Sequence, residues 1–123
     1  MATILVIEDD EPLRRFILRM LKPTGHTLLE APDGAEGIAV LERHDADLVI
    51  TDLLMPRKEG IATMREISAL RPATRFLAIS GGGAERNASF LEVAKVMGAH
   101  ETLAKPFTAQ ALLEAVKRVL ADG

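Results

Sequence analysis

The sequence of 123 residues contains no cysteine, no tryptophan and no tyrosine, and only four phenylalanines. Without cysteine the chain has no disulfides, thiolate metal sites or thiol nucleophiles, which suits a reducing compartment. Few aromatic rings, a net charge of −3 and no basic run argue against direct nucleic-acid binding, because such surfaces use cationic grooves or stacking rings. No apolar run reaches the length of a membrane span, and no signal peptide is recognisable. These absences predict a cytoplasmic domain that binds neither membrane nor nucleic acid.

Apolar residues make up 48% of the chain, enough for an ordinary packed core. A chain of this length buries about two-thirds of its unfolded surface, so it needs neither disulfides nor a structural metal to fold. No linker or low-complexity tract divides the sequence. We therefore expect residues 1–123 to form one domain.

Short apolar runs alternate with segments of helical periodicity along the chain. The runs predict strands at residues 3–7, 27–31, 47–52, 75–80 and 101–104. The periodic segments predict a helix starting near Pro12 and reaching Leu21, one capped by Asp33, one at 59–70, one at 84–97, and a last one capped by Thr108. Five strands alternating with five helices through short loops imply a parallel sheet covered by helices on both faces.

The functional crevice of an open parallel sheet lies beyond the carboxyl ends of its strands. The residues expected there are Glu8, Asp9 and Asp10 after the first strand, Asp52 at the end of the third, Ser80 at the end of the fourth, and Lys105 after the fifth. The second strand contributes only alanine and proline. Polar groups thus gather on the strands expected at the centre of the sheet, which predicts one site.

Carboxylates that share a site repel one another unless a cation lies between them. With no cysteine and no nearby histidine, this donor set favours a hard, oxygen-binding ion, Mg²⁺ or Mn²⁺. Lys105 adds a charge suited to a phosphoryl oxygen, and Ser80 adds a hydroxyl donor. Together they predict a phosphoryl-transfer site. Asp52 is the expected nucleophile because it ends its strand alone, whereas Glu8 and Asp9 form a metal-holding pair.

Some of these residues also have a plainer interpretation. Asp10 is predicted to cap the first helix, with a water-mediated contact to the metal as the alternative. A turn at the strand end is the alternative for Ser80. The triple glycine at residues 81–83 lacks the Lys-Ser/Thr of a P-loop, so we interpret it as a loop beside the site. The three histidines lie in separate segments and are assigned surface or packing roles.

Four short motifs follow one another along the chain: Ile4-Leu5-Val6-Ile7-Glu8-Asp9-Asp10, then Asp52-Leu53-Leu54-Met55-Pro56 with Gly60 soon after, then Ser80, then Lys105-Pro106-Phe107. In this order and at these spacings, the whole chain resembles a receiver domain of a two-component response regulator. The resemblance implies a three-layer α/β/α sandwich of the flavodoxin-like kind, with strand order 2-1-3-4-5 and five helices.

The resemblance also implies a role for each residue of the site. Glu8, Asp9 and Asp52 would bind Mg²⁺, with the main-chain carbonyl of Leu54 completing the protein's metal ligands. Asp52 would accept the phosphoryl group, which would receive a hydrogen bond from Ser80 and an ion pair from Lys105. In such domains the peptide bond between the lysine and the following proline is often cis.

Two positions depart from the usual receiver pattern. Thr102 stands three residues before the lysine, where many receivers carry an aromatic switch residue. Arg57-Lys58-Glu59 follows the Met-Pro pair, where an apolar-acid pair is commoner. Since Thr102 is too small to replace a ring, we predict that the switch is a rearrangement of the triple-glycine loop and of residues 84–89. Glycine tolerates such a backbone change at little steric cost.

The resemblance implies a phosphorelay protein rather than a turnover enzyme. A histidine kinase or a histidine phosphotransfer protein would donate the phosphoryl group to Asp52. With no output domain expected, the signal would leave through non-covalent contact with an unidentified downstream protein, or the domain would serve as a phosphate shuttle or sink. A monomer or a weak dimer is expected.

Two other classes of protein are alternatives to this hypothesis. A dehalogenase-type phosphatase also uses an aspartate nucleophile, but it carries a second acid two residues later, where this chain has Leu54. A flavin- or nucleotide-binding module of the same architecture would need polar phosphate-binding loops rather than an acidic crevice.

Overall fold

The computed structural model describes residues 1–52, 57–80 and 98–121, with only the backbone described at residues 57–61 and at Ser80. Statements about the structure refer to these ranges. The Leu54 carbonyl, the triple-glycine loop and the helix predicted at 84–97 lie outside them, as does the predicted switch region.

The described strands form one parallel sheet in the order β2-β1-β3-β4-β5, as predicted. They are β1 (Thr3–Ile7), β2 (Thr27–Ala31), β3 (Leu48–Asp52), β4 (Arg75–Ser80) and β5 (Glu101–Ala104). The described helices are α1 (Glu11–Leu21), the short 3₁₀ helix η1 (Lys22–Thr24), α2 (Gly34–Arg43), α3 (Arg57–Leu70) and α5 (Ala109–Ala121). Helix α3 begins two residues before the predicted start, because Arg57 and Lys58 are good helix formers and no breaker separates them from Glu59.

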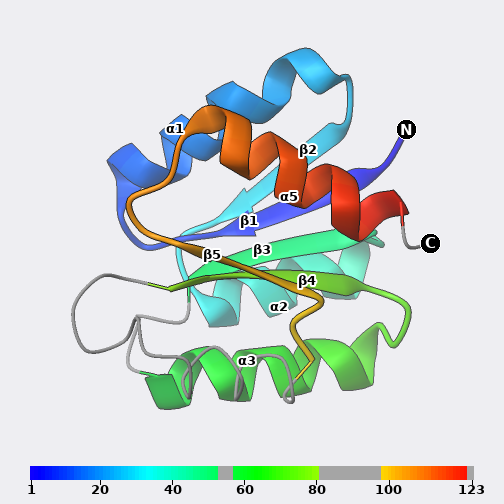
Figure 1. Cartoon of the computed structure of the whole chain (residues 1–123). Helices are drawn as coiled ribbons and strands as arrows, with labels where there is room; N and C mark the ends of the chain where they lie inside the picture. Colours follow the sequence, from blue (N-terminus) through cyan, green and yellow to red (C-terminus); the bar gives the residue numbers. More distant parts are fainter. Residues whose placement is uncertain (53–56, 81–97, 122–123) are drawn as a thin grey trace.

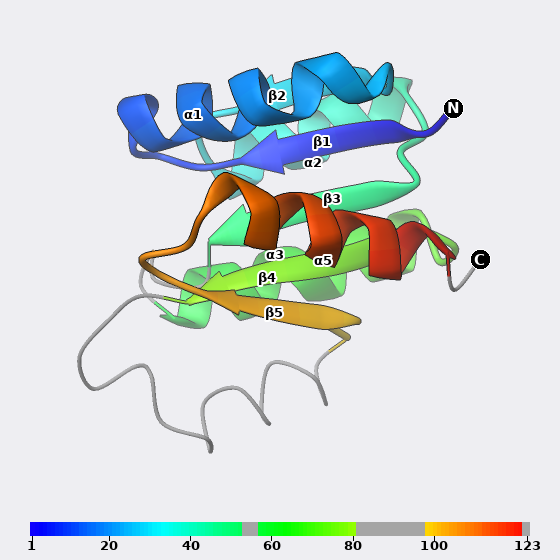
Figure 2. The same ribbon diagram turned by 45° about the horizontal axis from the view of Figure 1, so that its top comes forward.

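The sheet is the middle layer of a three-layer sandwich (Figure 1). Helices α1 and α5 cover one face, and α2 and α3 cover the other, an arrangement that a second view also shows (Figure 2). Alternate residues of the central strands enter the two cores. Ile4 and Val6 pack on the α1 and α5 side, whereas Leu5 and Ile7 pack on the α2 and α3 side. The predicted flavodoxin-like fold is therefore confirmed.

Helix starts show which capping predictions hold. The side chain of Asp33 accepts a hydrogen bond from the backbone N–H of Glu36 at 2.8 Å, and Thr108 accepts one from Ala111 at 3.0 Å, as predicted. Asp10 occupies the N-cap position of α1, as predicted, but its side chain makes no capping hydrogen bond. The prediction that this side chain caps the helix is therefore wrong. Part of the reason is Pro12, which lacks one of the N–H groups that an N-cap side chain would reach.

Strand register brings the ends of β1 and β3 together at the centre of the sheet. Ile7 is paired with Thr51. The next residues along the two parallel strands, Glu8 and Asp52, are consequently neighbours at the carboxyl edge. The sheet itself thus places two acids side by side that are far apart in the sequence.

Candidate functional site

Three carboxylates converge at the carboxyl edge of the central strands. Oxygen atoms from Glu8, Asp9 and Asp52 all lie within 4.8 Å of one another. The side chains of Glu8 and Asp52 are buried, whereas Asp9 is exposed. The predicted acid cluster is therefore present among the described residues, with two members inside the protein and one open to solvent.

Lys105 pairs with the acid at the centre of this cluster. Its Nζ donates to Asp52 Oδ2 at 2.6 Å, and the carboxylate is only 3% exposed while the lysine is 25% exposed. Lys105 follows β5 directly, and its peptide bond to Pro106 is cis, as the resemblance implied. Strands β3 and β5 are parallel and end at the same edge of the sheet, so the ammonium group of Lys105 lies beside the buried carboxylate of Asp52.

Glu8 carries an incompletely satisfied carboxyl group. Its Oε2 accepts a hydrogen bond from the backbone N–H of Asp10 at 3.0 Å, but its buried Oε1 has no hydrogen-bond partner among the described residues. Burial is the largest cause that raises the pKa of Glu8, and the charge of Asp52 and side-chain hydrogen bonds with Asp52 and Asp9 also raise it. Against the lowering effect of the Asp10 N–H, the net result is a pKa of about 8 instead of 4.5. In the metal-free protein this carboxyl therefore holds a proton at neutral pH.

The same features fit a hard divalent cation. A buried oxygen without a partner calls for an additional ligand, and a cation supplies one while also relieving the repulsion among the acids. The donors are all oxygens, with neither nitrogen nor sulfur, which matches the preference of Mg²⁺ and Mn²⁺. The residues present thus suit the predicted metal.

The raised pKa of Glu8 predicts how stability depends on pH in the absence of divalent metal. Between about pH 4.5 and 8 the folded protein holds a proton on Glu8 that the unfolded chain has lost. The free energy of unfolding should therefore fall as pH rises through this window, by up to about 5 kcal/mol. Urea unfolding in a chelator, followed by far-UV circular dichroism, measures it.

Glu8→Gln is the matched variant for this measurement, since it keeps the shape of the side chain and removes the titration. Other titrating groups are common to both proteins, so the difference between the two pH profiles isolates Glu8. If the variant shows the same slope as the parent, the pH dependence comes from elsewhere.

Of the remaining predicted site residues, Ser80 is described by its backbone alone. Ser80 ends β4, where its backbone pairs with Ala104 of β5, so its main chain reaches the correct edge of the sheet. Leu54 lies outside the described residues. Two histidines fit the predicted surface or packing roles: Nδ1 of the half-buried His26 accepts from the Ala2 N–H, and Nδ1 of the exposed His100 accepts from the Phe76 N–H.

Two features of the site were not predicted from the sequence. Arg14 of α1 donates a hydrogen bond to the main-chain carbonyl of Glu8, a member of the acid cluster. A cavity of about 500 Å³ beside the site is lined by Asp10, Leu13, Phe16, Lys105, Pro106 and Phe107. Four of these six side chains are apolar, so the cavity is largely apolar. The rings of Phe16 and Phe107 lie 6.2 Å apart, and Phe16 is 36% exposed. No sequence signal marked this cavity, because Phe16 lies on the same apolar stripe as the core residues Ile17 and Leu21, and its exposure depends on how α1 packs.

Residues 4–117 match the family model described as "Response regulator receiver domain". The chain belongs to this family. Receiver domains are phosphorelay signalling modules rather than turnover enzymes, and they bind Mg²⁺ at an acidic pocket of the kind described above.

Individual relatives extend this result. The chain is 31% identical to the chemotaxis protein CheY of Bacillus subtilis over 118 residues, which cover 95% of this chain and 96% of that protein. It is 34% identical over 115 residues to the transcriptional regulatory protein PdtaR of Mycobacterium tuberculosis, covering 93% of this chain and 54% of that protein. Against the sensor kinase CckA of Brucella abortus, identity is 31% over 121 residues, covering 97% of this chain and 12% of the kinase.

A solved structure is similar over nearly the same extent. The response regulator receiver domain protein from Clostridium thermocellum superposes with a TM-score of 0.85 at 33% identity, covering 99% of this chain and 96% of that one. The chain thus spans 12% and 54% of two of its curated relatives but nearly all of CheY. Among the described residues, no helix has the length and apolar character needed to cross a membrane.

Proposed function

We propose that the protein accepts a phosphoryl group from a histidine kinase or a histidine phosphotransfer protein onto Asp52, in a step that requires Mg²⁺. The observation that carries this proposal is the position of Asp52. Its carboxylate is buried, contacts the ammonium group of Lys105, and lies within 4.8 Å of oxygens of Glu8 and Asp9. A buried acid between a cationic group and a metal-binding pair is suited to act as a nucleophile on phosphorus.

The chemistry follows from these contacts. An oxygen of Asp52 attacks the phosphorus atom, a new O–P bond forms, and the P–N bond to the donor imidazole breaks with its electron pair remaining on nitrogen. Lys105 is already within 2.6 Å of Asp52, so its charge is close enough to pair with a phosphoryl oxygen after transfer. Bound Mg²⁺ would neutralise phosphoryl charge during the step.

The metal ligands and the contact from Ser80 are part of the same proposal. Glu8, Asp9 and Asp52 would hold the metal through their carboxylates, and the Leu54 carbonyl would complete the set. The Ser80 hydroxyl would donate to the phosphoryl group. Support for Ser80 comes from its place at the end of β4, in register with the residue just before Lys105.

Partners and setting are also proposals. The apolar cavity is lined in part by Lys105, whose ammonium group contacts Asp52, and it suits an amphipathic helix of the phosphoryl donor. CheY, matched over nearly its whole length, supports action as a separate domain. That domain would be cytoplasmic, monomeric or weakly dimeric, and would signal by binding a downstream protein. PdtaR and CckA contain the matching region within longer chains, so the domain organisation is a point to test.

The test is labelling by a small acyl phosphate. Incubation with acetyl phosphate and Mg²⁺ should add the mass of one phosphoryl group to the intact protein, detected by mass spectrometry at neutral pH. The added mass should disappear in hydroxylamine, which cleaves acyl phosphates, and should not form in a chelator. A protein that gains no mass under these conditions is not a phosphoryl acceptor.

A further inference from the structure

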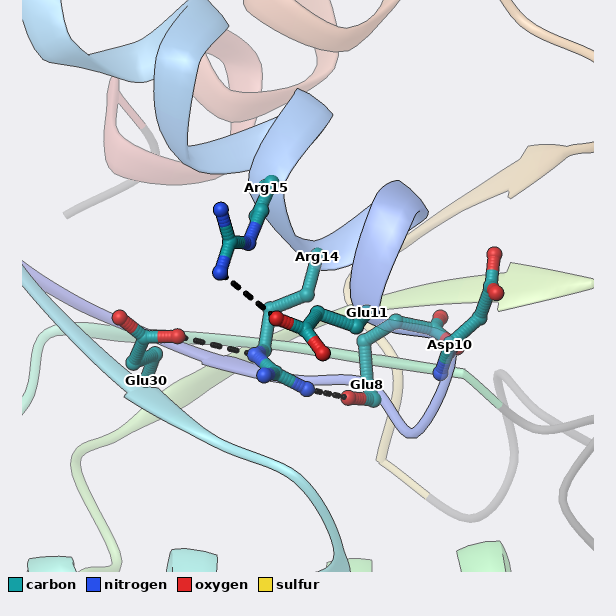
Figure 3. A network of polar contacts seen from close by, with 6 residues as sticks. All are labelled: Glu8, Asp10, Glu11, Arg14, Arg15 and Glu30. Carbon is teal, nitrogen blue, oxygen red and sulfur yellow. Dashed lines mark hydrogen bonds and ion pairs between the residues drawn. The ribbon is translucent and has the colours of Figure 1, made fainter.

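Arg14 of helix α1 contacts both Glu8, which follows β1, and Glu30 of β2, and so joins three segments of the chain (Figure 3). Its Nη1 donates to the main-chain carbonyl of Glu8 at 2.8 Å, and its Nε donates to Oε1 of Glu30 on β2 at 2.9 Å. The arginine side chain is only 15% exposed. A mostly buried guanidinium with two directed contacts is fixed in position, unlike a surface arginine.

The carbonyl that Arg14 binds belongs to the buried member of the acid cluster. Glu8 is tied at two further points, because its N–H donates to the Ala31 carbonyl at 3.1 Å and its Oε2 accepts from the Asp10 N–H at 3.0 Å. The chain turns from β1 into α1 at this residue. Arg14 thus adds a third hydrogen bond to Glu8, at its main-chain carbonyl.

Glu30 determines how the guanidinium is oriented. Its carboxylate receives the Nε–H, which leaves an Nη group directed at the Glu8 carbonyl (Figure 3). The two contacts use different nitrogens of a planar, rigid fork. A lysine ammonium is a point charge on a flexible stem, so it would not reproduce both directions.

Arg15 provides a contrast on the same helix. It pairs with Glu11 at 2.7 Å, but the two side chains are 70% and 57% exposed. An exposed pair four residues apart on a helix contributes little to stability and connects no residues beyond the helix surface. Arg15 therefore differs from Arg14 in its contacts and burial, although both are arginines of α1.

We infer that Arg14, oriented by Glu30, is a positioning residue for metal binding: it holds the Glu8 backbone so that the carboxylates of Glu8 and Asp9 are arranged for Mg²⁺ before the ion arrives. This inference rests on the proposed function. It adds a residue that touches neither metal nor phosphoryl group and acts through a main-chain carbonyl. Groups that support metal ligands in this way typically change metal affinity by about 10-fold to 100-fold when removed.

The test compares Mg²⁺ affinity among variants of the full chain, using MgCl₂ titrations followed by the amide NMR signals of residues 8–10. Arg14→Lys and Arg14→Ala should each weaken Mg²⁺ binding by about 10-fold, and Glu30→Gln should weaken it less. Labelling by acetyl phosphate should slow at limiting Mg²⁺, and added Mg²⁺ should restore most of the rate. Arg15→Ala, the matched control, should keep the parental affinity.

A second measurement examines the backbone in the absence of metal. Amide hydrogen exchange at Asp9 and Asp10 should accelerate in the Arg14 variants and stay parental in Arg15→Ala. If Arg14→Ala does not fold, Arg14→Lys and Glu30→Gln carry the test.

The possible failures are distinguishable. If the parent binds Mg²⁺ and is labelled, but Arg14→Lys and Glu30→Gln bind Mg²⁺ as tightly as the parent, Arg14 is only a structural link and the inference is wrong. If the parent itself neither binds Mg²⁺ nor is labelled, the proposed function fails, and this inference fails with it. In that case, faster amide exchange at Asp9 and Asp10 in the Arg14 variants would show only that Arg14 supports the backbone there.

Discussion

Asp52→Asn is expected to abolish phosphoryl labelling by acetyl phosphate. The amide is nearly the same size as the carboxylate but lacks the anionic oxygen that attacks phosphorus. Asp52 differs from the other clustered acids in its surroundings, since it is the one shown paired with Lys105 among the described residues, and Asp9 is exposed. Loss should therefore be complete within the detection limit of intact-protein mass spectrometry.

The fold should survive this substitution, because it removes one negative charge from a crowded acid cluster. A thermal melt checks that the variant is folded before its labelling is interpreted. Asp45→Asn is a suitable control, since Asp45 is 86% exposed and pairs with Arg71 away from the site. Labelling of Asp52→Asn at the parental rate would show that another residue accepts the phosphoryl group.

Asp9→Ala is expected to slow labelling by on the order of 100-fold at millimolar Mg²⁺. Asp9 is the exposed member of the cluster, so its carboxylate can serve the metal without supporting the core. With one of three anionic ligands gone, Mg²⁺ binds more weakly and less of the phosphoryl charge is neutralised during transfer. The labelling rate measured as a function of Mg²⁺ concentration separates these two effects.

The same substitution should make the metal-free protein slightly more stable, because it relieves repulsion with Asp52. A higher melting temperature in chelator, with a smaller gain from added Mg²⁺, would be the expected pattern. Asp10→Ala is the neighbouring control, since the Asp10 side chain is not one of the three clustered carboxylates and its contact with Glu8 is through the backbone N–H. Normal labelling of Asp9→Ala would mean that the acids are structural only.

Much of the fold could be predicted because the signals are local. Each described strand is a short apolar run, as at Leu48–Asp52, and each run ends at a polar residue or a turn. Alternation with helices implies parallel strands, and parallel strands end at one edge. It follows that Asp52, Glu8 and Lys105 lie together, although 53 positions separate the lysine from Asp52. The caps Asp33 and Thr108 were predictable for the same reason, since a cap acts over three residues.

The order of residues did not reveal which of the clustered acids is inside. Glu8 and Asp9 are adjacent and chemically alike, yet one is buried and the other exposed, because burial depends on how β1 and its neighbours pack. The raised pKa of Glu8 follows from that packing. The missing cap at Asp10 has a similar origin, since its N–H is drawn toward Glu8 while its side chain makes no capping bond.

For the described residues, the sequence by itself determined the secondary structure, the strand order through its resemblance, and the presence of Glu8, Asp9, Asp52 and Lys105 at the carboxyl edge. Only the tertiary structure decided how those groups are supported. Arg14 reaches Glu30 across 16 positions and binds a main-chain carbonyl of Glu8. A carbonyl is present at every residue, so no residue type marks it as a partner. Side-chain patterns report which surfaces become buried, whereas contacts with the backbone are set by the path of the folded chain.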